Sequence, residues 1–288
     1  MLLAPDLAHD PGAIRDHVQS LEGAGLDYLT TPEHVIGGHP DRAASEVVHT
    51  YDKPYHEPFV LFGYIAALTQ RLELGTSILI LPQRQTALVA KQAAELDILS
   101  GGRLRLGVGV GRNWMEYEVL DVPFAERGER LEEQVALLRR WWTEELVTFD
   151  GRYHHVDRMG INPLPVQRPI PIWMGSFVGK VVEKVIRRIG RTADGWMAQM
   201  QPDDAFSAVL ERLQGYARDA GRDPATIGVE GVARVKPGDD PDAWVHHALA
   251  FQQRGADHLK VSTVGFATPA EHTAAAQQWL AAVRSVVG

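Results

Sequence analysis

Short apolar segments alternate with segments of helical periodicity along the chain. The apolar segments are almost continuous in hydrophobic residues, which is expected of strands that are buried on both faces of a parallel sheet. Such an alternation restricts the fold to one that is built from βαβ units. The segments that we interpret as strands are residues 1–5, 26–31, 72–81, 103–110, 170–175, 193–198, 226–235 and 256–264.

The segments between these strands keep apolar residues at helical spacing. Thr86 begins one of them, which ends at the Ser-Gly-Gly of residues 100–102, and residues 131–142 and 182–189 repeat the pattern. Eight alternations of strand and helix predict a single (β/α)8 barrel domain over residues 1–288, with insertions in the loops at the C-terminal face. A doubly wound open sheet is the alternative that the pattern leaves open.

The composition narrows the class of partner. A formal net charge of −8 at pH 7 argues against a generic nucleic-acid surface. The chain has no cysteine, which excludes disulfides and thiolate chemistry and is typical of a cytoplasmic protein. No apolar run approaches the roughly 20 residues that span a bilayer, and the first ten residues lack the pattern of a signal peptide. We expect a cytoplasmic protein that acts on a small molecule, without nucleic acid or membrane.

The run SGGRLRLGVGVGRN of residues 100–113 is similar to a dinucleotide-binding loop but departs from it. Gly107 and Gly109 match the first two glycines of the G-x-G-x-x-G fingerprint, which opens a helix. Arg112 stands at the third position, and Gly111 comes one residue early. We therefore interpret the run as a strand, in which the glycines allow close packing or the close approach of a flat ring system.

A turn after residue 174 is a better candidate for binding an anion. Gly175, Ser176 and Gly179 lie between a strand and a helix, and free N–H groups at the start of a helix favour a phosphate. The glycines let a ligand approach the backbone, and Ser176 adds a hydroxyl. A glycine-softened turn with a serine cap is an equally supported alternative.

Glu33 and His34 directly follow the strand at residues 26–31, where a barrel places catalytic side chains. A histidine at this position can exchange a proton or hydrogen-bond a redox cofactor. The alternative is a histidine that merely caps the loop. Arg84 has two similar interpretations, a solvated loop charge or a contact to an anionic cofactor.

The other histidines do not form a recognisable metal motif. His154 and His155 are adjacent, as are His246 and His247, and adjacent side chains point in different directions on a helix or strand. The H-E-x-x-H pattern does not occur. We therefore predict no metal site.

Four segments together resemble the luciferase-like monooxygenase superfamily, and in particular its F420-dependent (deazaflavin) branch. They read LELGTSILILPQR, KQAAELDILSGGRLRLGVGVGRN, PIPIWMGS and GRTADGW, and the resemblance covers essentially the whole chain in order. It implies a TIM barrel with the cofactor ring at the C-terminal ends of the strands, and a homodimer. It also implies a non-prolyl cis peptide between Ser77 and Ile78, against the ring.

The resemblance assigns further residues to the cofactor site. His34, after the acidic Glu33, lies at the reactive face of the ring in such enzymes, so both are candidate catalytic residues. Cofactor-binding candidates are Ser77, Ile78, Gly109, Gly111, Asn113 and, as the phosphate-binding turn, Gly175, Ser176 and Phe177. The loop with His39, Tyr51, Tyr55 and His56 would shape the substrate pocket.

This resemblance implies hydride transfer between F420 and an unidentified small organic substrate, with His34 placed to hydrogen-bond or to protonate. An FMN-dependent monooxygenase that uses reduced flavin and O2 is the alternative within the superfamily. A non-catalytic cofactor-binding barrel is a third possibility, and the fold alone also allows a phosphosugar enzyme or a metal hydrolase. The sequence does not identify the substrate or the direction of hydride transfer.

Overall fold

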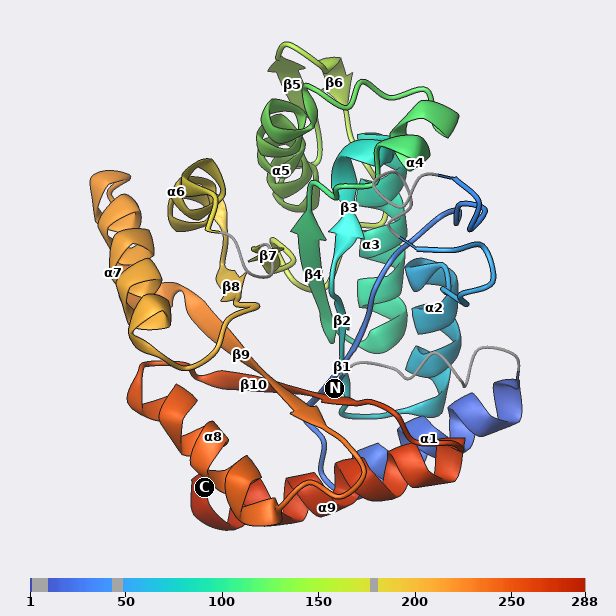
Figure 1. Ribbon diagram of the computed structural model, residues 1–288. Coiled ribbons are helices and arrows are strands. Elements are labelled where there is room, and N and C mark those ends of the chain that lie inside the picture. The colour runs from blue at the N-terminus through green and yellow to red at the C-terminus, as the bar shows by residue number, and fades with distance from the viewer. Residues whose placement is uncertain (2–9, 43–48, 177–180, 288) are drawn as a thin grey trace. The chain divides into compact units, whose positions relative to one another are not determined.

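The computed structural model describes residues 1, 10–42, 49–176 and 181–287. The chain divides into two compact units (Figure 1). We call Thr31–Ile172 the central unit, and Met1–Thr30 together with Trp173–Gly288 the terminal unit. The expected strand at residues 1–5 falls mostly outside the described residues.

The strands of the central unit run parallel and follow the apolar segments of the sequence. β2 (Glu73–Thr76) pairs with the first half of β4 (Leu104–Gly109), and β3 (Leu79–Ile80) pairs with its second half. The predicted strand at residues 72–81 is thus interrupted, and the interruption falls at Ser77–Ile78, whose peptide bond is cis as the resemblance implied. β1 (Tyr28–Thr31) is fully buried and ends in this unit.

The helices of the central unit confirm the helical periodicity of the sequence. α3 ends at Ser100 because Gly101 adopts a left-handed conformation with φ 72°, which caps the helix. Figure 1 shows α2 and α3 beside the strands β2 to β4. The bounds are α2 Pro58–Leu68, the 3₁₀ turn η2 Leu81–Gln83, α3 Thr86–Ser100, α4 Trp114–Val119 and α5 Arg127–Thr143.

The connection at residues 147–169 contains an antiparallel hairpin that the sequence analysis did not predict. β5 (Val147–Asp150) pairs with β6 (His155–Met159). Most of its side chains are exposed or half-buried, so the apolar signal that revealed the buried strands is weak here.

The terminal unit has four parallel strands in the order β7-β8-β9-β10. Glycines bring these strands close to bulky side chains: a Cβ at Gly228 would lie 2.5 Å from the Trp173 ring, and one at Gly231 would lie 2.6 Å from Phe251. The bounds are β7 Ile172–Gly175, β8 Gly195–Met197, β9 Gly228–Val235 and β10 His258–Thr263, with helices α1 Pro11–Gly23, α6 Glu183–Thr192, α7 Asp204–Asp219, η3 Pro224–Thr226, α8 Pro241–Gln253 and α9 Pro269–Val287.

Within the described ranges, every helix is too short or too polar to cross a membrane.

Candidate functional site

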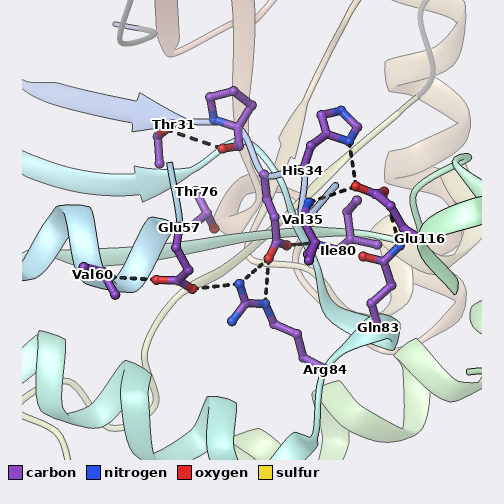
Figure 2. Close-up of polar contacts among 12 residues, drawn as sticks. Thr31, His34, Val35, Glu57, Val60, Thr76, Ile80, Gln83, Arg84 and Glu116 are labelled. Atoms are coloured by element: carbon purple, nitrogen blue, oxygen red, sulfur yellow. Dashed lines mark hydrogen bonds and ion pairs between the residues drawn. The ribbon is translucent and has the colours of Figure 1, made fainter. Parts of the chain in front are cut away.

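The candidate site lies at the carboxyl end of β1, in the central unit. There the chain leaves the buried Thr31 and passes through Pro32 to the two predicted residues, Glu33 and His34. Their side chains enter two separate hydrogen-bonded networks (Figure 2).

Glu33 belongs to a network that pairs its carboxyl group with a guanidinium. The Arg84 guanidinium donates from Nε to Glu33 Oε1 over 2.7 Å, and its Nη2 contacts the same oxygen. The Ile80 backbone N–H donates to Glu33 Oε2 at 2.6 Å, and Arg84 Nη2 also donates to Glu57 Oε1 at 2.7 Å. Burial raises the pKa of the Glu33 carboxyl, while the charge and hydrogen bonds of Arg84 oppose that rise. This network joins the end of β1 to β3 and to the start of α2.

The interpretation of Arg84 as a solvated loop charge is wrong, while its contact to an anionic cofactor stays a prediction. Its side chain is only 18% exposed, so it is not a solvated loop charge, and its donors are engaged by two carboxylates. Neither interpretation could anticipate this, because Glu33 and Glu57 are distant from Arg84 in the chain.

His34 belongs to a second network, centred on Glu116. The His34 Nδ1 atom lies 3.2 Å from Glu116 Oε1, and the Val35 backbone N–H donates to that same oxygen over 2.9 Å. Gln83 Nε2 approaches the other carboxylate oxygen at 3.4 Å. The Glu116 side chain is 0% exposed, whereas that of His34 is 20% exposed. One edge of the imidazole is thus held by a buried acid, and part of the ring remains accessible.

The electrostatics of Glu116 follow from these contacts. Burial opposes its ionisation, but the His34 ring, the Val35 N–H and the Gln83 amide together hold the pKa of Glu116 below its ordinary value. The sequence analysis missed both Glu116 and Gln83. Glu116 and Glu118 stand two residues apart on α4, and only packing distinguishes the buried acid from the exposed one.

Two further rings surround His34. The His49 ring centroid lies 3.8 Å from that of His34, and the Tyr55 ring meets His34 edge-on at 4.7 Å. Burial and the neighbouring His34 lower the pKa of His49. Of the four residues expected to shape the pocket, Tyr55 reaches His34, whereas His39 and Tyr51 stack on each other.

The same cluster has a spacing that could admit a divalent ion. Donor atoms of His34, His49 and Glu116 all lie within 4.8 Å of one another. The expectation of no metal site therefore stays a prediction. The side chains of His154 and His155 do not converge, since His154 hydrogen-bonds Glu133 while His155 hydrogen-bonds Asp150.

The predicted glycines pack beneath the Ser77–Ile78 segment. A side chain at Gly109 would collide with Ile78, and one at Gly111 would lie 2.8 Å from the Ile80 methyl Cγ2. Gly111 also adopts φ +61°, which is unfavourable for most other residues. Close packing, one of the two interpretations of Gly107 and Gly109, is therefore observed at Gly109, and Gly111 packs closely as well.

Asn113 stands out because its amide has no hydrogen-bond partner among the described residues. The side chain is 1% exposed, and both Oδ1 and Nδ2 are buried and unpaired there. Asn113 precedes α4 but makes no side-chain cap to it. Burying an unpaired amide costs about 1–3 kcal/mol, so the Asn113 amide is a candidate for hydrogen-bonding a ligand.

The expected phosphate turn belongs to the terminal unit. Gly175 ends β7, and the Ser176 hydroxyl accepts a hydrogen bond from Trp196 Nε1 at 3.1 Å. Phe177 lies outside the described residues. The following helix, α6, begins at Glu183.

Comparison with known protein families decides the family. The model of the luciferase-like monooxygenase family matches residues 3–286. The chain belongs to the luciferase-like monooxygenase family. The resemblance inferred from the sequence segments is thereby confirmed.

Two curated relatives of this luciferase-like protein are similar over most of its length. An uncharacterized protein of Mycobacterium tuberculosis is 34% identical over 212 residues, which are 71% of each chain. The F420-dependent glucose-6-phosphate dehydrogenase of Segniliparus rotundus is 32% identical over 230 residues, which are 74% of this chain and 65% of the relative.

A solved structure supports the fold class. The coenzyme F420-dependent tetrahydromethanopterin reductase of Methanopyrus kandleri aligns with a TM-score of 0.78 at 16% identity, over 99% of this chain and 97% of the reductase. The predicted α/β barrel fold is confirmed, and the doubly wound alternative is not supported. Family membership makes this protein a luciferase-like oxidoreductase.

Proposed function

We propose that this protein is an F420-dependent oxidoreductase that transfers a hydride between F420 and a small organic substrate. The observation that carries the proposal is the His34 imidazole, whose Nδ1 is held by the buried Glu116 while 20% of the side chain stays exposed. The F420 dependence of the relative from Segniliparus rotundus, 32% identical, supports this cofactor over other redox groups.

The residues present fit such a cofactor. The buried Asn113 amide has no partner among the described residues, so its N–H and C=O groups would be able to hydrogen-bond a heteroaromatic ring. The cis segment Ser77–Ile78, packed on Gly109, would support the ring. That Gly175 and Ser176 of the terminal unit bind a phosphate stays a prediction from the sequence. When bound, F420 supplies the chemistry of accepting or donating a hydride at a ring carbon.

Each side chain of the site would then have a different role in the reaction. His34 would accept or supply the proton that accompanies hydride transfer. Glu33 is fully engaged by Arg84 and Ile80, so we propose that it acts by fixing the backbone before His34 rather than by touching the reacting atoms. Tyr55 and His49 would exclude water from one side of the imidazole.

Titration of the purified protein with F420 and with FMN tests the proposal. We expect binding of F420, measured by its fluorescence, and weaker binding of FMN. Asn113→Ala should weaken F420 binding about tenfold, the equivalent of one lost hydrogen bond, with a change in unfolding free energy below about 1 kcal/mol. Gln252→Ala, which removes an exposed amide on α8, is the matched control.

A protein that binds FMN and ignores F420 would overturn the choice of cofactor. That result would favour the second candidate, an FMN-dependent monooxygenase, for which the family description itself is the supporting observation. Binding of neither cofactor would contradict both.

We also propose that the protein is a homodimer and acts in the cytoplasm. α2 contains no charged residue, yet Val60 is 75% exposed and Tyr64, one turn later, is 40% exposed. A helix that is apolar on all sides is usually buried, and a second copy would cover it. Sedimentation equilibrium should give twice the chain mass of 31.8 kDa, and a monomer at micromolar concentration would contradict the proposal.

A further inference from the structure

Two acids lie close to the proposed proton-transfer residue, and they are not equivalent. Glu33 precedes His34 in the chain but is bound by Arg84 and by the Ile80 N–H. Glu116 is 82 residues away in sequence and contacts the imidazole itself (Figure 2). The sequence points to the first acid, whereas the geometry points to the second.

We propose that Glu116 is a positioning residue for His34: it holds the Nδ1 edge of the imidazole, so that Nε2 is presented to the reacting atoms. The inference rests on the proposed function, because it concerns the same histidine and the same reaction. Glu116 itself touches neither substrate nor cofactor in this role.

The Glu116 carboxylate is well fixed for such a task. Its Oε1 accepts a hydrogen bond from the Val35 N–H and also contacts His34 Nδ1. Two adjacent residues of the chain therefore share this one acceptor. The next residue on α4, Tyr117, is fully buried, and its hydroxyl donates to the Val110 carbonyl at 2.6 Å. α4 is therefore anchored to the loop after β4, and Glu116 has little freedom to turn away.

The contact selects one tautomer of the imidazole. An ionised carboxylate only accepts hydrogen bonds, so the proton of a neutral His34 ring must lie on Nδ1. Nε2 then carries a lone pair that can take a proton, and after protonation the same nitrogen can give it back. A buried carboxylate also stabilises the imidazolium that forms in between.

Other neighbours hold the ring without competing for Nδ1. The Tyr55 ring meets His34 at an interplanar angle of 75°, and the His49 ring is tilted by 42° against it. Among the described residues, the charged and titratable groups that face His34 or adjoin it are Glu116, His49, Tyr55 and, through the chain, the Glu33–Arg84 pair. Of these, Glu116 is the acid in contact with the ring.

The first test measures the tautomer directly and needs no cofactor. The ring ¹⁵N signals of His34 are measured by NMR in labelled protein that has been dialysed against a chelator, because the histidine cluster could bind zinc. The neutral His34 ring should carry its proton on Nδ1. In Glu116→Gln, whose amide can either accept or donate, that preference should be lost. A wild-type ring with its proton on Nε2 would overturn the proposal, whether or not the variant folds.

The second test uses turnover with F420 and an accepted substrate. Glu116→Gln should lower kcat at least about tenfold, with KM and the F420 dissociation constant changed less than threefold, because ground-state binding does not use this contact. Glu118→Gln, an exposed acid two residues further on the same helix, is the control and should keep full activity. Unchanged kcat in Glu116→Gln would contradict the inference.

The two tests separate this inference from the proposed function. If the protein uses FMN instead of F420, the function is wrong while the tautomer result still decides the role of Glu116. If F420 binds and reacts but the tautomer is unaffected by Glu116→Gln, only the positioning role is wrong.

Discussion

Glu33 and His34 are neighbours in the chain, but they belong to two networks that handle charge in opposite ways. The Glu33 network pairs the carboxylate with Arg84, whose guanidinium keeps its proton at any ordinary pH. The Glu116 network pairs a carboxylate with an imidazole, which can lose its proton. The Glu33–Arg84 network can therefore only stabilise the end of β1, whereas the His34 ring of the Glu116 network can also take up and release a proton.

The largest effect is expected from breaking the fixed ion pair. Arg84→Met leaves Glu33, only 2% exposed, as a buried acid without its cation. We expect a loss of about 3 kcal/mol in the free energy of unfolding, measured in urea at pH 7. Glu57→Gln is the control, because Glu57 is 40% exposed and should cost about 1 kcal/mol or less. Equal losses in the two variants would show that the Glu33 network does not stabilise the site.

The second effect separates catalysis from stability. His34→Ala should lower kcat by on the order of 100-fold, which corresponds to about 2.7 kcal/mol in the activation barrier, because the proton acceptor is lost. Its free energy of unfolding should change by less than about 1 kcal/mol, in contrast to Arg84→Met. His155→Ala, at a side chain that is 72% exposed and outside the loop expected to shape the substrate pocket, serves as the control. Full turnover by His34→Ala with every accepted substrate would refute its catalytic role.

A histidine of the terminal unit, His17, has no acidic partner among the residues that the structure describes. His17 on α1 is 2% exposed, and its Nδ1 lies 2.7 Å from the Thr273 hydroxyl. Burial, with the nearby His272 and the N-terminal amino group, lowers the pKa of His17 to about 4 from 6.5. The folded state thus favours the neutral His17 ring. The stability that the neutral ring contributes is fully present above pH 6.5 and is lost as the pH falls toward 4.

The expected consequence is a pH dependence of unfolding that His17 controls. Between pH 7 and pH 5 the protein should lose about 2 kcal/mol of unfolding free energy through this group. In His17→Asn the loss over the same interval should be much smaller, whereas in His155→Asn, an exposed control, it should equal that of the wild type. A His17→Asn variant with the wild-type pH dependence would contradict the shift.

Much of the fold could be predicted because buried strands and amphipathic helices carry a local signal. The cis peptide at Ser77–Ile78 came from the family resemblance, and the end of α3 at Ser100 came from the glycines that follow it. The hairpin at Val147–Met159 was missed because its strands are mostly exposed and lack a continuous apolar run. Exposure, rather than length, removed the signal.

The candidate site was predicted only in part. Position after β1 was enough to single out Glu33 and His34, since the carboxyl ends of strands face the active site of a barrel. It could not tell that Arg84 binds Glu33, or that His34 is held by an acid from α4. Those partners come from remote segments, and no local pattern records which remote side chains will meet.

By itself, the sequence determined the alternation of strands and helices, the family, and the short list of residues after each strand, because all of these depend on local composition and spacing. Only the tertiary structure decided which carboxylate is bound by a guanidinium and which by an imidazole. Glu116 and Glu118 are both glutamates on one short helix, but only Glu116 is buried and contacts the His34 ring. The sequence determines which side chains can be charged, but the pKa and the chemical role of each one depend on the groups that the fold places next to it.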